Sequence, residues 1–117
     1  MGPRGNVVAS RLAKEADVIL ALGTRLGFNS TFYSYDNINR EADIIQVELE
    51  PTAIGRYFPI RLGIWADARA AARQLVAALA RLDANAAVEA WTRTYVDERE
   101  AYLQKRDADA DLSLIHI

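Results

Sequence analysis

The sequence predicts an α/β fold in which a mainly parallel sheet lies between two layers of helices. Three observations support this expectation. The run VILAL at residues 18–22 is continuously apolar, which is typical of a parallel strand covered on both faces. A helix-to-strand junction recurs, because EADVI at residues 15–19 is echoed by EADII at residues 41–45. An amphipathic helix follows from residue 68, so helices and strands alternate along the chain.

The first helix is predicted at about residues 7–16, after a loop of sequence GPRG. Asn6 is the expected N-cap, because its short side chain can accept a hydrogen bond from the first helical turn. Apolar residues recur on the side of this helix that we expect to be buried: Val8, Ala9, Leu12 and Ala16. The apolar strand at 18–22 follows directly.

A long polar and aromatic loop is predicted at residues 27–39. Its aromatic residues are Phe28, Phe32, Tyr33 and Tyr35, which we expect to serve in packing or in a subunit contact. A second strand is predicted at 44–48 and ends before Pro51, which cannot donate to a strand ladder. A third short strand is predicted at 60–64.

The clearest helix begins after Asp67, its expected N-cap. Its apolar stripe consists of Ala68, Ala72, Leu75, Leu79 and Leu82. The core of the domain is predicted to contain residues from two strands and this helix: Val18, Leu20, Leu22, Ile45, Val47, Leu75 and Leu79.

A last helix is predicted at residues 86–105, with Val88, Trp91, Tyr95 and Tyr102 on one stripe. Residues 107–111 form an acidic, solvated stretch, and the composition changes abruptly at residue 112. The segment 112–117 resembles translated read-through at the end of an assembled reading frame, and we expect it not to be native. The expected organisation is therefore an α/β domain of nucleotide-binding type at 1–83, truncated at its N-terminal side, a helix at 84–106 that leads toward a downstream domain, and a solvated tail at 107–117.

Composition excludes several classes of function. The 117 residues suit one soluble domain, and the net charge of −2 offers no basic face for nucleic acid. No apolar run approaches the about 20 residues that span a bilayer, so no membrane partner is expected. With no cysteine, and with His116 as its one histidine, the chain suits neither a zinc site nor a Ser-His-Asp triad. We assign no catalytic or metal-ligating residue and expect a cytoplasmic location.

The candidate site follows the first strand. In open parallel sheets, ligands bind outside the carboxyl ends of the strands. Gly23, Thr24 and Arg25 lie there, where a glycine permits close backbone approach and a guanidinium can grip a phosphate. An ordinary turn with a surface arginine is the alternative. Asp67 is similarly open to two interpretations, as a helix cap or as part of a binding site.

Three motifs, taken together in this order, resemble the central domain of thiamine-diphosphate-dependent enzymes of the acetolactate synthase group. ADVILALGTR at 16–25 is similar to the family's strand ending in Gly-x-Arg. IIQVELEPTAIG at 44–55 is similar to a strand followed by Asp-x-Asp-Pro-x-x-Ile-Gly. GIWADARAAARQL at 63–75 is similar to Gly-x-x-Gly-Asp-Ala before a helix. The resemblance covers roughly residues 2–82 and implies a Rossmann-like, DHS-like NAD/FAD-binding fold.

The resemblance implies FAD or ADP binding at the strand ends. The residues it places there are Arg4, Gly23, Thr24, Arg25, Glu48, Leu49, Ala66, Asp67 and Ala68. Two departures concern this pocket: Glu48 and Glu50 stand where aspartates are usual, and Ala66 replaces a glycine. For the aromatic loop, stacking on an isoalloxazine ring is the alternative to packing.

The resemblance also implies that this chain is the middle of a larger enzyme acting on 2-oxo acids. Thiamine diphosphate and Mg²⁺ would be bound by the preceding and following domains, whose motifs this sequence lacks, and the parent would be a homodimer or homotetramer. Acetolactate synthase, sulfoacetaldehyde acetyltransferase and related carboligases and decarboxylases share this domain, so substrates stay open. The alternatives are a stand-alone nucleotide-binding module and a scaffold or oligomerisation domain without a nucleotide.

Overall fold

The computed structural model describes residues 6–27, 31, 36–83 and 85–115. The chain divides into two compact units, Met1–Leu82 and Asp83–Ile117, and each is described by itself.

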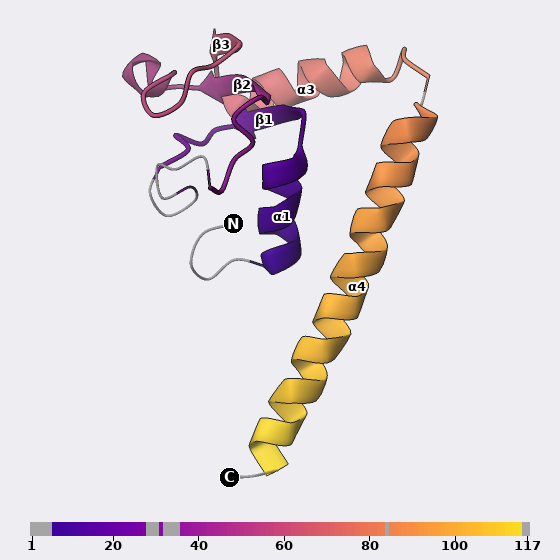
Figure 1. The fold of residues 1–117 in the computed structure, drawn as a ribbon. Coiled ribbons are helices and arrows are strands. Elements are labelled where there is room, and N and C mark those ends of the chain that lie inside the picture. Colours follow the sequence, from indigo (N-terminus) through magenta and orange to yellow (C-terminus); the bar gives the residue numbers. More distant parts are fainter. Residues whose placement is uncertain (1–5, 28–30, 32–35, 84, 116–117) are drawn as a thin grey trace. The chain divides into compact units, whose positions relative to one another are not determined.

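The first unit contains a parallel sheet of three strands in the order β1-β2-β3. The strands are β1 (Val18–Leu22), β2 (Asp43–Glu48) and β3 (Leu62–Trp65). Figure 1 shows α1 (Val7–Glu15) and α3 (Ala68–Leu79) on opposite sides of this sheet. The predicted fold class, a parallel sheet between two layers of helices, is confirmed.

Short-range hydrogen bonds set the start of each of these helices as the sequence predicts. The side chain of Asn6 accepts a hydrogen bond of 2.8 Å from the Val8 N–H and caps α1. The carboxylate of Asp67 accepts one of 2.9 Å from the Ala70 N–H and caps α3. Helix α3 ends at Leu79, earlier than the predicted stripe, and Leu82 closes a tight turn by donating 3.0 Å to the Leu79 carbonyl.

Strand β3 begins later than the predicted range of 60–64. The Arg61 N–H donates to the Ile44 carbonyl at 2.8 Å, and strand pairing then begins with Leu62 opposite Ile45. Ile60 instead packs against the core from the loop before the strand. Its apolar character therefore reflects burial outside the sheet.

The core lies on the face of the sheet opposite α3, and we call it the packed face. Its buried cluster consists of Ala21, Leu26, Ile38, Ile44 and Phe58, with Ile19 and Ile60 packed against it.

The predicted core list was largely wrong, because it drew on the other face, which we call the open face. There Val47 is buried, and Ile45 and Leu75 are half-buried. Four predicted members are exposed: Val18, Leu20, Leu22 and Leu79. The physical reason is coverage, since α3 contacts β2 while β1 lies at the edge of the sheet.

The second unit is a single long helix, α4 (Ala86–Ile115). Asn85 begins it, because its side chain accepts 2.9 Å from the Ala87 N–H. The prediction that the helix ends near residue 105 was wrong: α4 continues through the acidic stretch at 107–111. No glycine or proline interrupts this part of the chain, and alanines between the aspartates favour the helix.

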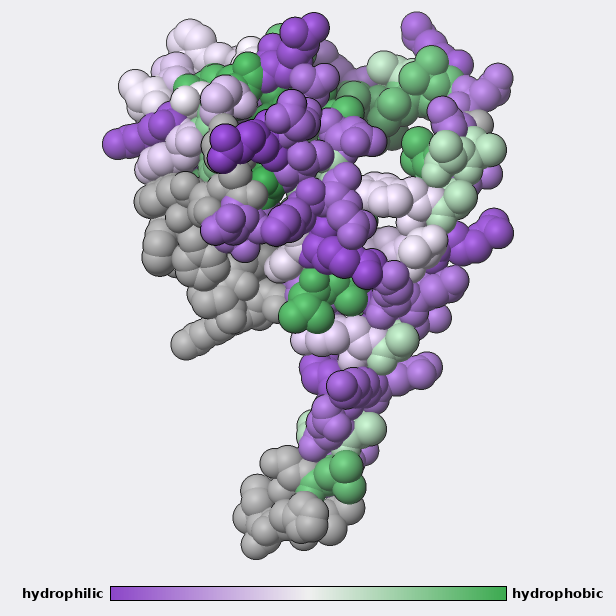
Figure 2. Space-filling view, viewed as in Figure 1, coloured by the Kyte–Doolittle hydropathy of each residue, from purple (hydrophilic) through white to green (hydrophobic). Residues whose placement is uncertain are grey.

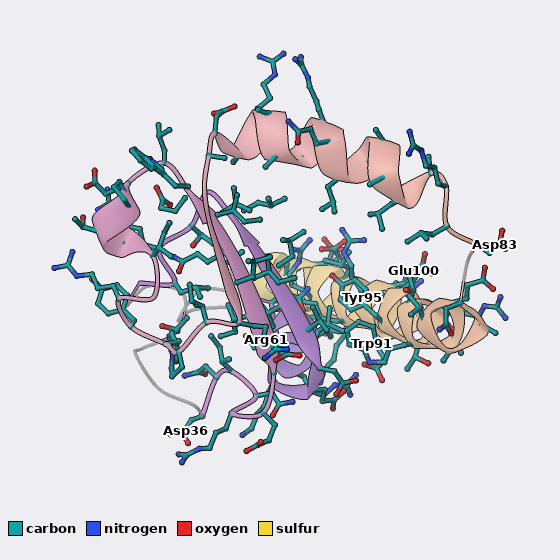
Figure 3. All side chains as sticks on the ribbon, turned by 90° about the horizontal axis from the view of Figure 1, so that it is seen from above. Asp36, Arg61, Asp83, Trp91, Tyr95 and Glu100 are labelled. Atoms are coloured by element: carbon teal, nitrogen blue, oxygen red, sulfur yellow. The ribbon has the colours of Figure 1, made fainter. Side chains whose placement is uncertain are left out.

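Hydrophilic residues predominate along the visible side of α4 in Figure 2. Val88 and Trp91 are exposed, whereas Tyr95 and Tyr102 are half-buried. Trp91 and Tyr95 are labelled on the helix in Figure 3. Within the described residues, no helix is both long enough and apolar enough to cross a membrane.

Candidate functional site

The carboxyl ends of the three strands meet at one edge of the sheet, and this edge brings the predicted site residues together. The pairing of β1 with β2 ends with Leu22 opposite Val47, and that of β2 with β3 ends with Glu48 opposite Trp65. Backbone hydrogen bonds continue past the strands: the Gly23 N–H donates 2.8 Å to the Val47 carbonyl. The turns after β1, β2 and β3 are therefore neighbours, as the motif positions predict.

Gly23 lies where the turn after β1 meets the start of α3. Its φ is +64°, a left-handed conformation that glycine adopts without strain. A Cβ added at Gly23 would lie 3.2 Å from the Cβ of Ala68, the first residue of α3. The glycine thus allows the end of β1 to pack directly against the start of α3, so two predicted site residues touch.

In the turn after Gly23, Arg25 is exposed and the next residue, Leu26, has a strained backbone. Leu26 is buried with a φ of 54°, which is rare and costly for a bulky residue. The Thr24 hydroxyl accepts 3.2 Å from the Leu26 N–H, and the Thr31 hydroxyl donates 3.0 Å to the Leu26 carbonyl. Leu26 is thereby anchored in the core while Arg25, its neighbour, is exposed to solvent.

Gln46 is a structural residue of this edge that sequence reasoning missed. Its side chain is almost fully buried and its Nε2 donates 3.2 Å to the carbonyls of both Thr24 and Ala53. Its Oε1 accepts 2.8 Å from the Gly55 N–H. One side chain therefore ties the loop after β1 to the loop after β2. The sequence feature that indicates this role is a single amide side chain within the otherwise apolar run IIQV at 44–47.

The two predicted carboxylates already serve the backbone. Glu48 Oε1 accepts hydrogen bonds of 3.1 and 3.2 Å from the N–H groups of Leu49 and Glu50, and Asp67 caps α3. The Leu49 carbonyl accepts 2.9 Å from the Trp65 indole. These contacts fix the local turns, and the ligand-binding roles of Glu48, Leu49, Ala66 and Asp67 remain predictions.

Other predicted features lie outside the described residues. These are Arg4 and the aromatic side chains of Phe28, Phe32, Tyr33 and Tyr35. Among the residues that the structure does describe, no group of three His, Cys, Asp or Glu is placed to hold a metal ion.

The first unit has one hollow away from the predicted edge and one groove that reaches this edge at Ala66. A hollow of about 290 Å³ opens at the amino edge, between residues 39–44 and Arg61. Figure 3 labels Arg61 at the end of the sheet remote from the start of α3. A larger groove of about 640 Å³ separates α3 from the open face. The carboxyl edge offers a guanidinium, backbone groups and a capped helix start, which suit an anion laid across the turns.

Comparison with known proteins gives consistent matches. A family model described as the thiamine pyrophosphate enzyme central domain matches residues 1–75. Sulfoacetaldehyde acetyltransferase of Rhodobacter capsulatus is 46% identical over 88 residues, which are 74% of this chain and 14% of that protein. Sulfoacetaldehyde acetyltransferase of Roseovarius nubinhibens is 36% identical over 107 residues, 90% of this chain and 18% of that protein. The chain thus spans less than a fifth of the length of these curated relatives.

Proposed function

We propose that this chain is the middle part of an acetyl-transferring enzyme. The premise is that the chain belongs to the thiamine pyrophosphate enzyme family and forms its central domain. The parent protein would be a transferase of the sulfoacetaldehyde acetyltransferase type. The observation that carries this proposal is the 46% identity to the Rhodobacter capsulatus enzyme over 74% of the chain. A second relative extends the likeness to 90% of the chain.

The chemistry of such a parent would reside in thiamine diphosphate, which supplies carbanion stabilisation when bound. The described residues do not form a metal-binding group, and the relatives carry more than four-fifths of their length outside the matched segment. We propose that the sites for thiamine diphosphate and Mg²⁺ lie in that remaining part of the parent. We also propose that the parent is a homodimer or homotetramer in the cytoplasm.

Two roles are proposed for the domain itself. In the first, the edge formed by Gly23, Arg25 and Ala68 binds the phosphates of FAD or ADP. The exposure of Arg25 beside a glycine turn supports this role. In the second, the domain is a scaffold without a nucleotide, which the internal use of Glu48 and Asp67 supports. If a nucleotide binds, Arg25 and backbone groups would contact its phosphates, and the second oxygen of each carboxylate could still accept a hydrogen bond from the ligand.

Expression of the full parent reading frame tests the proposal. With thiamine diphosphate, Mg²⁺ and a nucleophilic acceptor for the acetyl group, the parent should consume sulfoacetaldehyde, and removal of thiamine diphosphate should abolish turnover. The 117-residue chain alone should show no turnover under the same conditions. Consumption of pyruvate without any activity on sulfoacetaldehyde would instead assign the parent to another branch of the family.

The absorbance spectrum of the purified parent distinguishes the two domain roles. Flavin absorbance in the visible range, or release of ADP on denaturation, supports the binding role. Neither signal, together with no heat of binding on titration with ADP or FAD, supports the scaffold role.

A further inference from the structure

Trp65, the last residue of β3, is an exposed aromatic side chain at the carboxyl edge of the sheet. It is 71% exposed, although tryptophan is one of the side chains with the most apolar surface to bury. Leu49, in the turn after β2, is 66% exposed. The Trp65 indole N–H donates 2.9 Å to the Leu49 carbonyl, so the two residues are neighbours. The edge therefore carries an apolar patch that lies largely in water.

The pleat of β3 determines the side of the sheet on which the Trp65 ring lies. Leu62 and Ile64 line the groove under α3, so Trp65, at the alternate position, points to the packed face. Gly63 points the same way, and a Cβ added there would lie 2.5 Å from Cγ2 of Ile54, in the loop after β2. This loop therefore lies against the same face of β3. The indole hydrogen bond fixes one edge of the Trp65 ring to the loop and leaves the rest of the ring exposed.

The three strands place three kinds of side chain in a row along the carboxyl edge. Arg25 follows β1, Glu48 ends β2 and Trp65 ends β3. Glu48 is paired directly with Trp65, and the strand order is β1-β2-β3. Neighbouring strands are about 4.8 Å apart, so roughly 10 Å separates the end of β1 from the end of β3. A guanidinium, a carboxylate and an aromatic ring thus follow one another in the order of the phosphate, ribose and purine of an adenine nucleotide.

We infer that the adenine ring of a bound nucleotide stacks on Trp65, while its phosphates lie at Arg25. This inference rests on the proposed nucleotide-binding role of the domain and names the residue that binds the base. Base stacking on an aromatic side chain needs an exposed ring, and a ring of fixed orientation loses little freedom on binding. Glu48 lies between the two groups, where a strand-end carboxylate accepts a hydrogen bond from a ribose hydroxyl in doubly wound sheets.

Tyr57 is the other exposed aromatic side chain among the described residues of the first unit. It is 37% exposed, and the Arg56 guanidinium lies 5.7 Å from the centroid of its ring. A cation thus already lies over this ring, and Tyr57 belongs to the loop between β2 and β3 and not to a strand end. For Trp65 itself, the alternative is a packing contact with another part of the parent, which the experiment below separates from stacking.

Calorimetric titration of the parent tests the role of Trp65. The parent is first saturated with thiamine diphosphate and Mg²⁺, so that the titrated ligands do not enter the diphosphate site of that cofactor. Trp65→Ala should weaken ADP binding about five- to a hundredfold, the usual loss when a stacked base loses its aromatic partner. The affinity for inorganic pyrophosphate should not change, because pyrophosphate has no base. Trp65→Phe should keep most of the ADP affinity, since a phenyl ring also stacks.

Trp91 provides the matched control. It is the other tryptophan of this segment, is 43% exposed and lies on α4, so Trp91→Ala should bind ADP as the unmodified parent does. The same pair of residues allows the stacking itself to be observed. ADP should reduce the tryptophan fluorescence of the parent, and this change should disappear in Trp65→Phe and persist in Trp91→Phe.

Equal ADP affinities of the parent and Trp65→Ala would overturn the inference and identify Trp65 as a packing residue. Equal losses of ADP and pyrophosphate affinity would also overturn it, because they would indicate a general disturbance of the edge. If the unmodified parent binds neither ADP nor FAD, the nucleotide-binding role fails and the inference fails with it. A parent that is inactive on sulfoacetaldehyde but binds ADP through Trp65 would refute the proposed activity and leave this inference standing.

Discussion

The two faces of the sheet receive similar side chains from β1 and yet differ in burial. Ile19 and Ala21 point to the packed face, where the loops after β1 and β2 fold over them. Val18, Leu20 and Leu22 point to the open face, where α3 covers β2 and leaves β1 exposed. Both sides of this one strand are therefore wholly apolar. The comparison teaches that burial depends on the element that lies across a strand.

The packed face also contains a buried, hydrogen-bonded glutamine, whereas the glutamine on the open face is exposed. Gln46 joins the loops after β1 and β2 by hydrogen bonds to Thr24, Ala53 and Gly55, and so fixes these loops over the core. Gln74, which lines the groove on the open face, is exposed. This pair of glutamines, like the apolar residues, allows the two faces to be tested against each other.

The largest difference is expected from apolar truncations on the two faces. Phe58→Ala should lower the free energy of unfolding by about 3–5 kcal/mol, because it removes a buried ring from the core cluster and leaves a cavity. Leu20→Ala on the open face should cost less than roughly 1 kcal/mol, since much of this side chain is already in water. Urea denaturation of the 117-residue chain measures both. Equal losses would show that the open face is covered in solution.

The two glutamines should differ by a smaller amount. Gln46→Leu removes the donor to the Thr24 carbonyl and the acceptor of the Gly55 N–H, whereas the Ala53 carbonyl still accepts from the Arg56 N–H at 3.4 Å. One such buried loss costs about 1–3 kcal/mol. Gln74→Leu should change the free energy of unfolding by less than about 0.5 kcal/mol, as an exposed substitution does. The same denaturation experiment compares them. If Gln46→Leu is as mild as its control, Gln46 does not hold the covering loops.

The next effect concerns the junction between β1 and α3. Gly23→Ala should cost roughly 1–2 kcal/mol, because an L-residue is strained at its positive φ and its Cβ would crowd Ala68. Gly27→Ala is the control, since an added Cβ there meets nothing within 4 Å. Denaturation midpoints of the two variants give the comparison. A neutral Gly23→Ala would mean that α3 does not pack closely on this turn.

Much of the local structure follows from the sequence because local chemistry decides it. The apolar run fixes the bounds of β1, and Asn6 and Asp67 cap their helices through residues two or three positions away. The gathering of Gly23, Glu48 and Ala68 at one edge also follows, because parallel strands share an edge.

The rest depends on contacts between residues far apart in the chain. Gln46 reaches a carbonyl 22 positions away, and no short pattern announces such a partner. The apolar run of β1 likewise predicts two covered faces but does not reveal whether a cover for each belongs to this segment. The end of α4 differs from the prediction for the opposite reason: an acidic, solvated composition predicts the end of a helix, whereas the alanines between the aspartates favour its continuation.

The smallest change in the free energy of unfolding is expected for a substitution outside both faces, at Arg25. This residue is exposed beside the strained Leu26, so Arg25→Ala should alter the free energy of unfolding by less than about 0.5 kcal/mol. Arg25→Ala should instead weaken the binding of the nucleotide. A charge-assisted hydrogen bond to a phosphate contributes roughly 1.5–3 kcal/mol, so the affinity of the parent for ADP or FAD should fall about ten- to a hundredfold. Calorimetric titration of the parent and its variant measures this loss, with Arg73→Ala as a control that also removes an exposed arginine. If the parent binds the nucleotide and Arg25→Ala binds it equally well, the carboxyl edge beside β1 is a folding junction and the nucleotide site lies elsewhere.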